Sequence, residues 1–303
     1  MAGPQKSRSD KIKLGIACVY FFRDEDAWIL DMQLDFIEKT TDVEFVLYAS
    51  AARLQDSLKQ TLASRKFVKI VDMPPFDDVG GPEHGFFLSH LVRQAANDGC
   101  THVCTLDCDS FPVRRGWPEL LVSQMGCEYE VAAVFRAENM DTDLPHPCGV
   151  MMTENIARQE DLQFWPDEAM QNSEEFKVYI EETGQRFDTG IGLGYALWKA
   201  GKPWLRLLRS NTRDLHYLMA GIYGSIFFHL GASSRRPAFY LDFHTRRLVR
   251  LSVALKGIPV IWRFGRFLEN RNLDRNEKTG LTIREELRKD PNEFFRSLDS
   301  DIR

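Results

Sequence analysis

The chain has 303 residues, of which 44% are apolar and 27% charged, values that are ordinary for a globular protein with a substantial core. Its formal net charge of −5 excludes a molecule built as a whole to bind nucleic acid. The polar first residues lead directly into an apolar segment without the pattern of a signal peptide, and no apolar stretch approaches the length of a membrane span. We therefore expect a cytoplasmic protein, or one that lies peripherally on the inner face of a membrane.

Apolar strands and amphipathic helices alternate along the first hundred residues. The pattern predicts strands at 14–22, 42–50 and 67–75, and helices at 27–41, 54–64 and 85–99. A further buried strand is expected at 103–106. Alternation of this kind is typical of an α/β protein with a mostly parallel central sheet flanked by helices.

The second half of the chain continues with less regular spacing. We expect a helix at 116–124 with Pro118 in its first turn, strands at 130–137 and 146–155, and helical structure after Pro166. The segment RFDTGIGLGYALWKAGKPWLRLL combines a loop, a helix that begins near Gly190 and a strand. The last residues are highly charged and favour helix.

Two aspartates stand one residue apart in THVCTLDCDSFP, directly after the apolar run that ends at Leu106. Residues i and i+2 of an extended segment point to the same side, so the carboxylates of Asp107 and Asp109 are expected to converge. Two carboxylates that close repel each other unless a cation lies between them. The pair either holds a cation or belongs to an Asx-type turn that separates the charges.

Four features in chain order resemble a GT-A fold glycosyltransferase, the class that uses nucleoside-diphosphate sugars. They are the α/β first half, the acidic pair in LDCDSFP that resembles the DxD motif, Asp188 in FDTGIGLGYAL, and His229 in FFHLGASSR. The resemblance covers roughly residues 12–236. It implies a Rossmann-related sheet, with a nucleotide-binding half at about 12–115 and an acceptor and catalytic half at 116–236. Residues 237–303 would then form a basic, aromatic segment and a charged helical tail.

The same resemblance implies roles for the acidic pair and the histidine. Asp109 would bind a divalent cation directly, Asp107 would contact the ribose or the cation through water, and His229 would supply a further ligand. Imidazole suits Mn²⁺ better than Mg²⁺, so Mn²⁺ is the expected metal and Mg²⁺ the alternative. A histidine on a strand is otherwise most often a hydrogen-bonded core residue.

Asp188 would act as the general base that takes the proton from the acceptor hydroxyl, as implied for the acid at the head of this helix in inverting enzymes. FDTG departs from the Glu-Asp pair that is usual there. The alternative role for Asp188 is that of a helix cap, and the two roles are compatible.

Other positions are expected to contact the nucleotide. Tyr20, at the end of the first strand, could stack on the nucleobase, and Asp72, at the end of the third, could form a hydrogen bond with it. Arg235, together with Arg236, could pair with the diphosphate. His84 precedes a helix whose N-terminus could face a phosphate, or lies in an exposed cap region. His146 could line the acceptor pocket or be an ordinary loop residue.

The stretch 235–267 is basic and aromatic, and it has three interpretations. It could be a loop that covers the substrate, a segment that rests on an anionic membrane, or a flank that packs on the core with its arginines in solvent.

The function predicted first is metal-dependent transfer of a sugar from a UDP- or GDP-linked donor to a hydroxyl acceptor such as a glycan or glycolipid. A sugar-phosphate nucleotidyltransferase shares the layout, but VYFFRDEDAW lacks the glycine-rich basic loop that such enzymes carry after the first strand. A non-catalytic nucleotide- or carbohydrate-binding protein of the same fold is the third alternative, since such a protein needs no base at Asp188.

Overall fold

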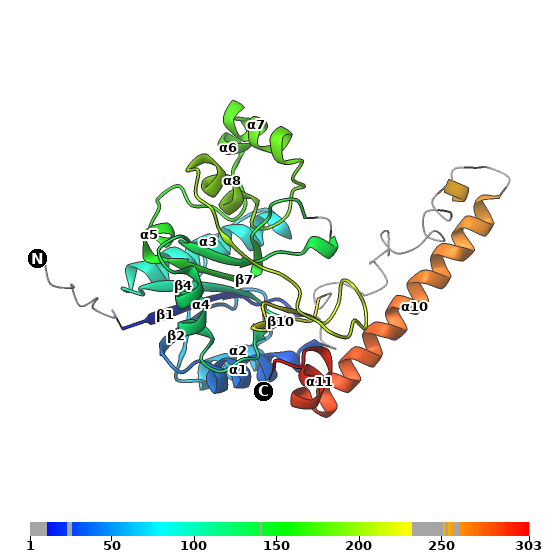
Figure 1. Ribbon diagram of the computed structural model, residues 1–303, viewed down its shortest axis with the longest axis horizontal. Coiled ribbons are helices and arrows are strands. Elements are labelled where there is room, and N and C mark those ends of the chain that lie inside the picture. The colour runs from blue at the N-terminus through cyan, green and yellow to red at the C-terminus, as the bar shows by residue number, and fades with distance from the viewer. Residues whose placement is uncertain are drawn as a thin grey trace, which may run out of the picture.

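The computed structural model describes residues 11–22, 26–139, 141–231 and 261–302, together with 251, 254–256 and 258. Its centre is a seven-stranded sheet in the order β3-β2-β1-β4-β7-β6-β8 (Figure 1). The strands are β1 (Lys13–Val19), β2 (Glu44–Ser50), β3 (Val68–Ile70), β4 (His102–Asp107), β6 (Val131–Val134), β7 (His146–Thr153) and β8 (Leu205–Leu207).

The sheet is parallel except at one strand. β1 pairs in parallel with β2 on one side and with β4 on the other, and β6 pairs in parallel with β8. β7 lies between β4 and β6 and is antiparallel to both. The expected α/β class with a mostly parallel sheet is confirmed.

Helices cover both faces of the sheet (Figure 1). On one face, α1 (Ile29–Thr40), α2 (Asp56–Ser64) and α4 (Trp117–Met125) contribute to a single hydrophobic cluster. On the other face, α3 (Gly81–Asn97), α5 (Glu154–Ala157) and α8 (Ile191–Lys199) form a second cluster. The short α6 (Glu168–Asn172) and α7 (Glu174–Thr183) extend the structure beyond α8. Most predicted helix boundaries agree with these to within a few residues, although α3 begins four residues earlier than expected.

A small antiparallel sheet stands beside the main one. Its order is β5-β10-β9, formed by β5 (Ser110–Pro112), β9 (Gly221–Tyr223) and β10 (Phe227–His229). β5 follows the acidic pair directly, and its pairing with β10 joins two segments that are more than a hundred residues apart in sequence. This small sheet decides where His229 lies.

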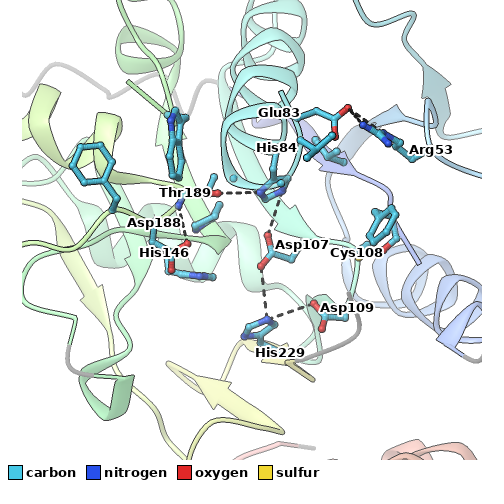
Figure 2. A pocket seen from close by; sticks show the side chains of 18 of the residues that line it. Arg53, Glu83, His84, Asp107, Cys108, Asp109, His146, Asp188, Thr189 and His229 are labelled. Atoms are coloured by element: carbon cyan, nitrogen blue, oxygen red, sulfur yellow. Dashed lines mark hydrogen bonds and ion pairs between the residues drawn. The ribbon is translucent and has the colours of Figure 1, made fainter. Parts of the chain in front are cut away.

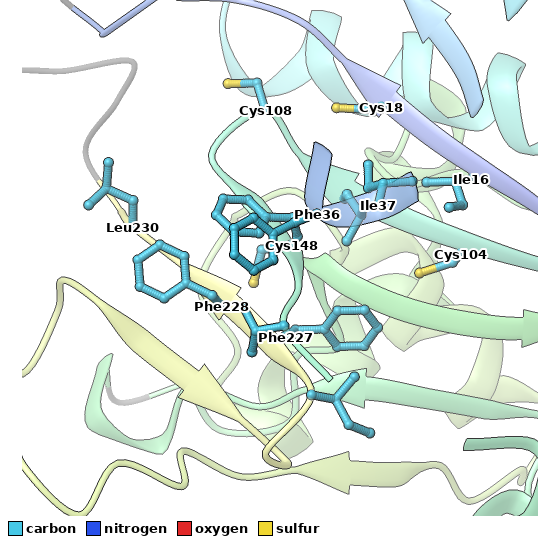
Figure 3. Packing of buried hydrophobic residues seen from close by; sticks show 14 of the residues in the cluster. Ile16, Cys18, Phe36, Ile37, Cys104, Cys108, Cys148, Phe227, Phe228 and Leu230 are labelled. Carbon is cyan, nitrogen blue, oxygen red and sulfur yellow. The ribbon is translucent and has the colours of Figure 1, made fainter. Parts of the chain in front are cut away.

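The C-terminal helices α10 (Trp262–Lys289) and α11 (Pro291–Leu298) are anchored on the first cluster. The N-terminal part of α10 projects from the body of the molecule (Figure 1). Phe295 of α11 packs against Phe36 of α1 and Phe228 of β10, with ring centroids 5.2 and 4.9 Å apart. Figure 3 shows Phe36 and Phe228 within this packing. The tail therefore supports the small sheet and shares the core of the main one.

Most of the basic aromatic stretch at 235–267 lies outside the described residues, so its three interpretations remain predictions. Its described end, the beginning of α10, exposes Trp262, Phe264 and Phe267. Among the described helices, none is both long and apolar enough to cross a lipid bilayer.

Candidate functional site

A cavity of about 610 Å³ opens at the carboxyl ends of β1 and β4. The strand order reverses at this pair, because β2 lies on one side of β1 and β4 on the other. Ligands of open α/β sheets bind in the crevice at such a switch point. Val19 at the end of β1 is in register with Asp107 at the end of β4, and both line the cavity.

The turn that carries the two aspartates is held by several hydrogen bonds. The Asp107 backbone N–H donates to Ser110 Oγ at 2.9 Å, and the Cys108 thiol donates to the carbonyl oxygen of Phe21 at 3.1 Å. The side-chain amide of Gln33, which is buried on α1, donates to the carbonyl oxygens of Asp107 (2.8 Å) and Ser110 (2.6 Å). These bonds hold the backbone of the turn from which both carboxylates extend.

The small sheet brings His229 to this turn. His229 pairs with Ser110 across β10 and β5, and the Leu230 N–H donates to the Asp109 carbonyl oxygen at 3.0 Å. His229 Nε2 lies 3.4 Å from Asp109 Oδ1 and 3.7 Å from Asp107 Oδ2 (Figure 2). One ligand atom from each of the three side chains lies within 4.8 Å of the others. The three residues that the sequence named as metal ligands therefore form one cluster.

The electrostatics of this cluster favour a positive charge between the side chains. Burial raises the pKa of Asp107, an effect that the nearby His84 and His229 oppose. Burial also disfavours protonation of His229, but Cys148 and Asp109 outweigh it and raise the pKa of His229 well above its usual value. Cys148 and Asp109 thus favour a proton on the imidazole, and a divalent cation would satisfy the carboxylates of Asp107 and Asp109.

His84 and His146 border the cluster from two other elements. His84, in the first turn of α3, places Nε2 3.7 Å from Asp107 Oδ1 and Nδ1 3.3 Å from the Thr189 hydroxyl (Figure 2). His146 and Cys148, on β7, each place a ligand atom within 4.8 Å of Asp107. Both histidines line the cavity, so His84 belongs to the site and not to an exposed cap.

Asp188 lies on the cavity wall opposite β1, held by Arg136. Arg136 donates from Nη2 to Asp188 Oδ2 at 2.9 Å and from Nε to Asp141 Oδ2 at 3.0 Å. The Thr189 N–H donates to Asp188 Oδ1 at 2.8 Å. Burial lowers the pKa of Arg136, but Asp141 and Asp188 outweigh this and raise it, so the guanidinium stays charged. Each oxygen of Asp188 retains a second lone pair that can face the cavity.

The glycines of FDTGIGLG let this loop approach its neighbours closely. Gly190 has φ +107° and precedes the first residue of α8, Ile191. A Cβ at Gly190 would lie 2.4 Å from the Pro145 carbonyl oxygen, so a larger residue would push the loop away from β7. Asp188 therefore stands three residues before Ile191, the first residue of α8, in a turn fixed by packing.

Two of the expected nucleotide contacts, Tyr20 and Asp72, do not line the cavity, and a third falls outside the residues that the structure describes. Tyr20 is buried in the first hydrophobic cluster, because Val19 and Phe21 point to the cavity and the residue between them points the other way. Asp72 is exposed beyond the end of the edge strand β3 and does not line the cavity. Arg235, like Arg236, lies outside the described residues.

Several lining or supporting residues were not identified from the sequence. Gln33 lies on the buried face of α1, and Arg136 lies between β6 and the short 3₁₀ helix Ala137–Asn139. Phe21 and Arg53 line the cavity on the β1 side, and Trp165 lines it on the far side. The one signal that could have identified a member of this set was the apolar surroundings of Gln33 in ILDMQLDFI, where a polar residue on the buried face of a helix needs a specific partner.

No family model matches the chain, and no curated protein matches its sequence. Among solved structures, the chain is similar to the galactosyltransferase LgtC in complex with donor and acceptor sugar analogues (TM-score 0.41, 12% identity, 65% of this chain and 73% of that chain). It is similar to the mannosyltransferase PcManGT from Pyrobaculum calidifontis in complex with GDP-Man and Mn²⁺ (TM-score 0.41, 11% identity, 68% of this chain and 59% of that chain). It is also similar to mouse xyloside xylosyltransferase 1 (TM-score 0.40, 11% identity, 65% of this chain and 85% of that chain). These values do not assign the chain to a family.

Proposed function

We propose that the protein is a metal-dependent glycosyltransferase that moves a sugar from a UDP- or GDP-linked donor to a hydroxyl acceptor. The observation that carries the proposal is the convergence of Asp107, Asp109 and His229 at the crevice between β1 and β4. A nucleotide bound at this switch point would place its diphosphate next to the two carboxylates. Only a cation makes that arrangement of negative groups stable.

The residues present fit a divalent cation. Among the described residues, Asp107 Oδ1 is buried and accepts no hydrogen bond, although the turn around it is otherwise held by specific bonds. Two carboxylates and one imidazole are donors that Mn²⁺ accepts well, and the diphosphate and water can complete an octahedron. Asp109 and His229 are the proposed direct ligands, and Asp107 the third or a water-mediated one.

Asp188 is the residue that we propose as the general base of an inverting transfer. In the inverting case, Asp188 accepts the proton of the acceptor hydroxyl while that oxygen bonds to the anomeric carbon, and the bond from this carbon to the diphosphate oxygen breaks. Arg136 holds the Asp188 carboxylate in the orientation that faces the cavity. A bound divalent cation would stabilise the negative charge that develops on the departing diphosphate.

A donor panel tests this proposal. We expect the purified protein with Mn²⁺ to release UDP or GDP from at least one nucleotide sugar, slowly to water and faster with added glycosides, and to stop when EDTA is added. A parallel assay with nucleoside triphosphates and sugar phosphates should release no pyrophosphate. Pyrophosphate release, or nucleotide release that EDTA leaves unchanged, would contradict the proposal.

A further inference from the structure

We propose that Trp165 and Phe187 form the platform on which a sugar ring of the acceptor rests, so that the acceptor is a glycoside and neither a polypeptide side chain nor a bare lipid. This inference rests on the proposed glycosyl transfer and adds to it the chemical class of the acceptor. It concerns the part of the cavity that lies between α3 and the loop before α8.

The cavity has aromatic side chains on two sides of Asp107. Phe21 follows β1 and is 45% exposed, and it lines the side next to Arg53, where the switch point places the nucleotide. Trp165 and Phe187 line the other side. Phe187 directly precedes Asp188, the proposed base, so a group that rests on Phe187 has its hydroxyls within reach of that carboxylate.

The platform is built into the fold. A Cβ at Gly81 would lie 2.6 Å from the Trp165 ring, and a Cβ at Gly85 would lie 2.4 Å from the Trp165 Cβ. Trp165 can therefore pack directly on the backbone of α3 only because these two residues have no side chain. Trp165 and Phe187 have ring centroids 6.0 Å apart with planes at 58°. Phe176 also packs against Phe187, with ring centroids 5.9 Å apart and planes at 66°.

The polar groups beside this platform match a sugar better than other acceptors. Phe187 is 48% exposed, which is unusual for a phenylalanine packed against two other aromatic rings. Asp188 and Thr189 follow Phe187 in the chain, and His84 Nδ1 lies 3.3 Å from the Thr189 hydroxyl; all three of these polar residues line the cavity. A pyranose offers one face of C–H groups for the rings and an edge of hydroxyls for such polar partners. A lipid chain offers no such edge of hydroxyls.

The test compares the binding of methyl glycosides to wild type and Phe187→Ala. UDP and GDP are titrated first, with Mn²⁺. Methyl glycosides of glucose, galactose, mannose, xylose and N-acetylglucosamine are then titrated into the nucleotide-bound protein, with tryptophan fluorescence as the readout. We expect at least one glycoside to bind, Phe187→Ala to weaken it about tenfold with nucleotide affinity unchanged, and Phe187→Tyr to retain it.

Phe86→Ala is the matched control, because Phe86 is also partly exposed and stacked on another ring, that of Phe76, but does not line the cavity. It should bind glycosides as wild type does. The inference is overturned if no glycoside binds to protein that binds nucleotide, if Phe187→Ala binds glycosides normally, or if that variant loses nucleotide affinity instead. Failure of wild type to bind any nucleotide would overturn the proposed function itself, which the first titration reveals separately.

Discussion

Asp109→Ala is expected to lower donor turnover by about 10²–10³-fold while leaving the fold intact. The carboxylate of Asp109 lies 3.4 Å from His229 Nε2, so the substitution removes a proposed cation ligand. The hydrogen bond from the Leu230 N–H to the Asp109 backbone carbonyl, which joins the turn to the small sheet, does not involve that carboxylate. The measurement is metal-dependent release of UDP or GDP from the donor that wild type uses. Metal-independent turnover should be equally low in both proteins.

Asp161→Ala serves as the control for this prediction, because Asp161 is exposed and does not line the cavity. It should turn over donor at the wild-type rate. Thermal unfolding of both variants would show whether a loss of activity reflects the site or the fold. Wild-type activity in a folded Asp109→Ala protein would mean that the acidic pair is only a turn.

Arg284→Met is expected to destabilise the protein by about 3–5 kcal/mol. Arg284 on α10 donates to both carboxylate oxygens of Asp26, at 2.7 and 3.2 Å, and Asp26 is fully buried in the segment that leads into α1. Removing the guanidinium leaves a buried carboxylate without its cation, which costs more than the pair itself contributes. Urea unfolding monitored by circular dichroism measures the change.

The double variant Asp26→Leu with Arg284→Met shows whether Arg284→Met lowers the unfolding free energy because it leaves a buried charge or because it removes packing. It should recover most of the stability that Arg284→Met loses, because no charge then remains to be buried. Arg288→Met is a matched single control, since this arginine lies on the same helix and rests over the Trp28 ring. Equal unfolding free energies for Arg284→Met and wild type would show that α10 is not anchored through this pair.

The sequence predicted most of the elements from local patterns, and it singled out Asp107 and Asp109 because they stand one residue apart. Strand-helix alternation has a period that is visible in a single chain, and it places Asp107 at a strand end. The resemblance then indicated that His229 would join the pair. The structure adds the reason, which is the pairing of β5 with β10 directly after the turn.

The errors and omissions come from contacts between distant segments. The Tyr20 prediction failed by one residue, because which of two neighbouring side chains faces the crevice depends on where the twisted strand ends. Arg136 and Asp188 are 52 residues apart, and Gln33 and Asp107 are 74 apart, so neither pairing leaves a local pattern. The position of Trp165 against Gly81 and Gly85 likewise depends on how the loop after α5 packs on α3.

Calorimetric titration of the purified protein with UDP and GDP, with and without Mn²⁺, tests the cation-dependent nucleotide site most directly. We predict micromolar binding of one of the two nucleotides that requires the metal and is lost in Asp109→Ala. Binding of neither nucleotide to the folded protein, or equal binding without metal, would contradict the proposal that Asp107, Asp109 and His229 hold a cation for a sugar nucleotide.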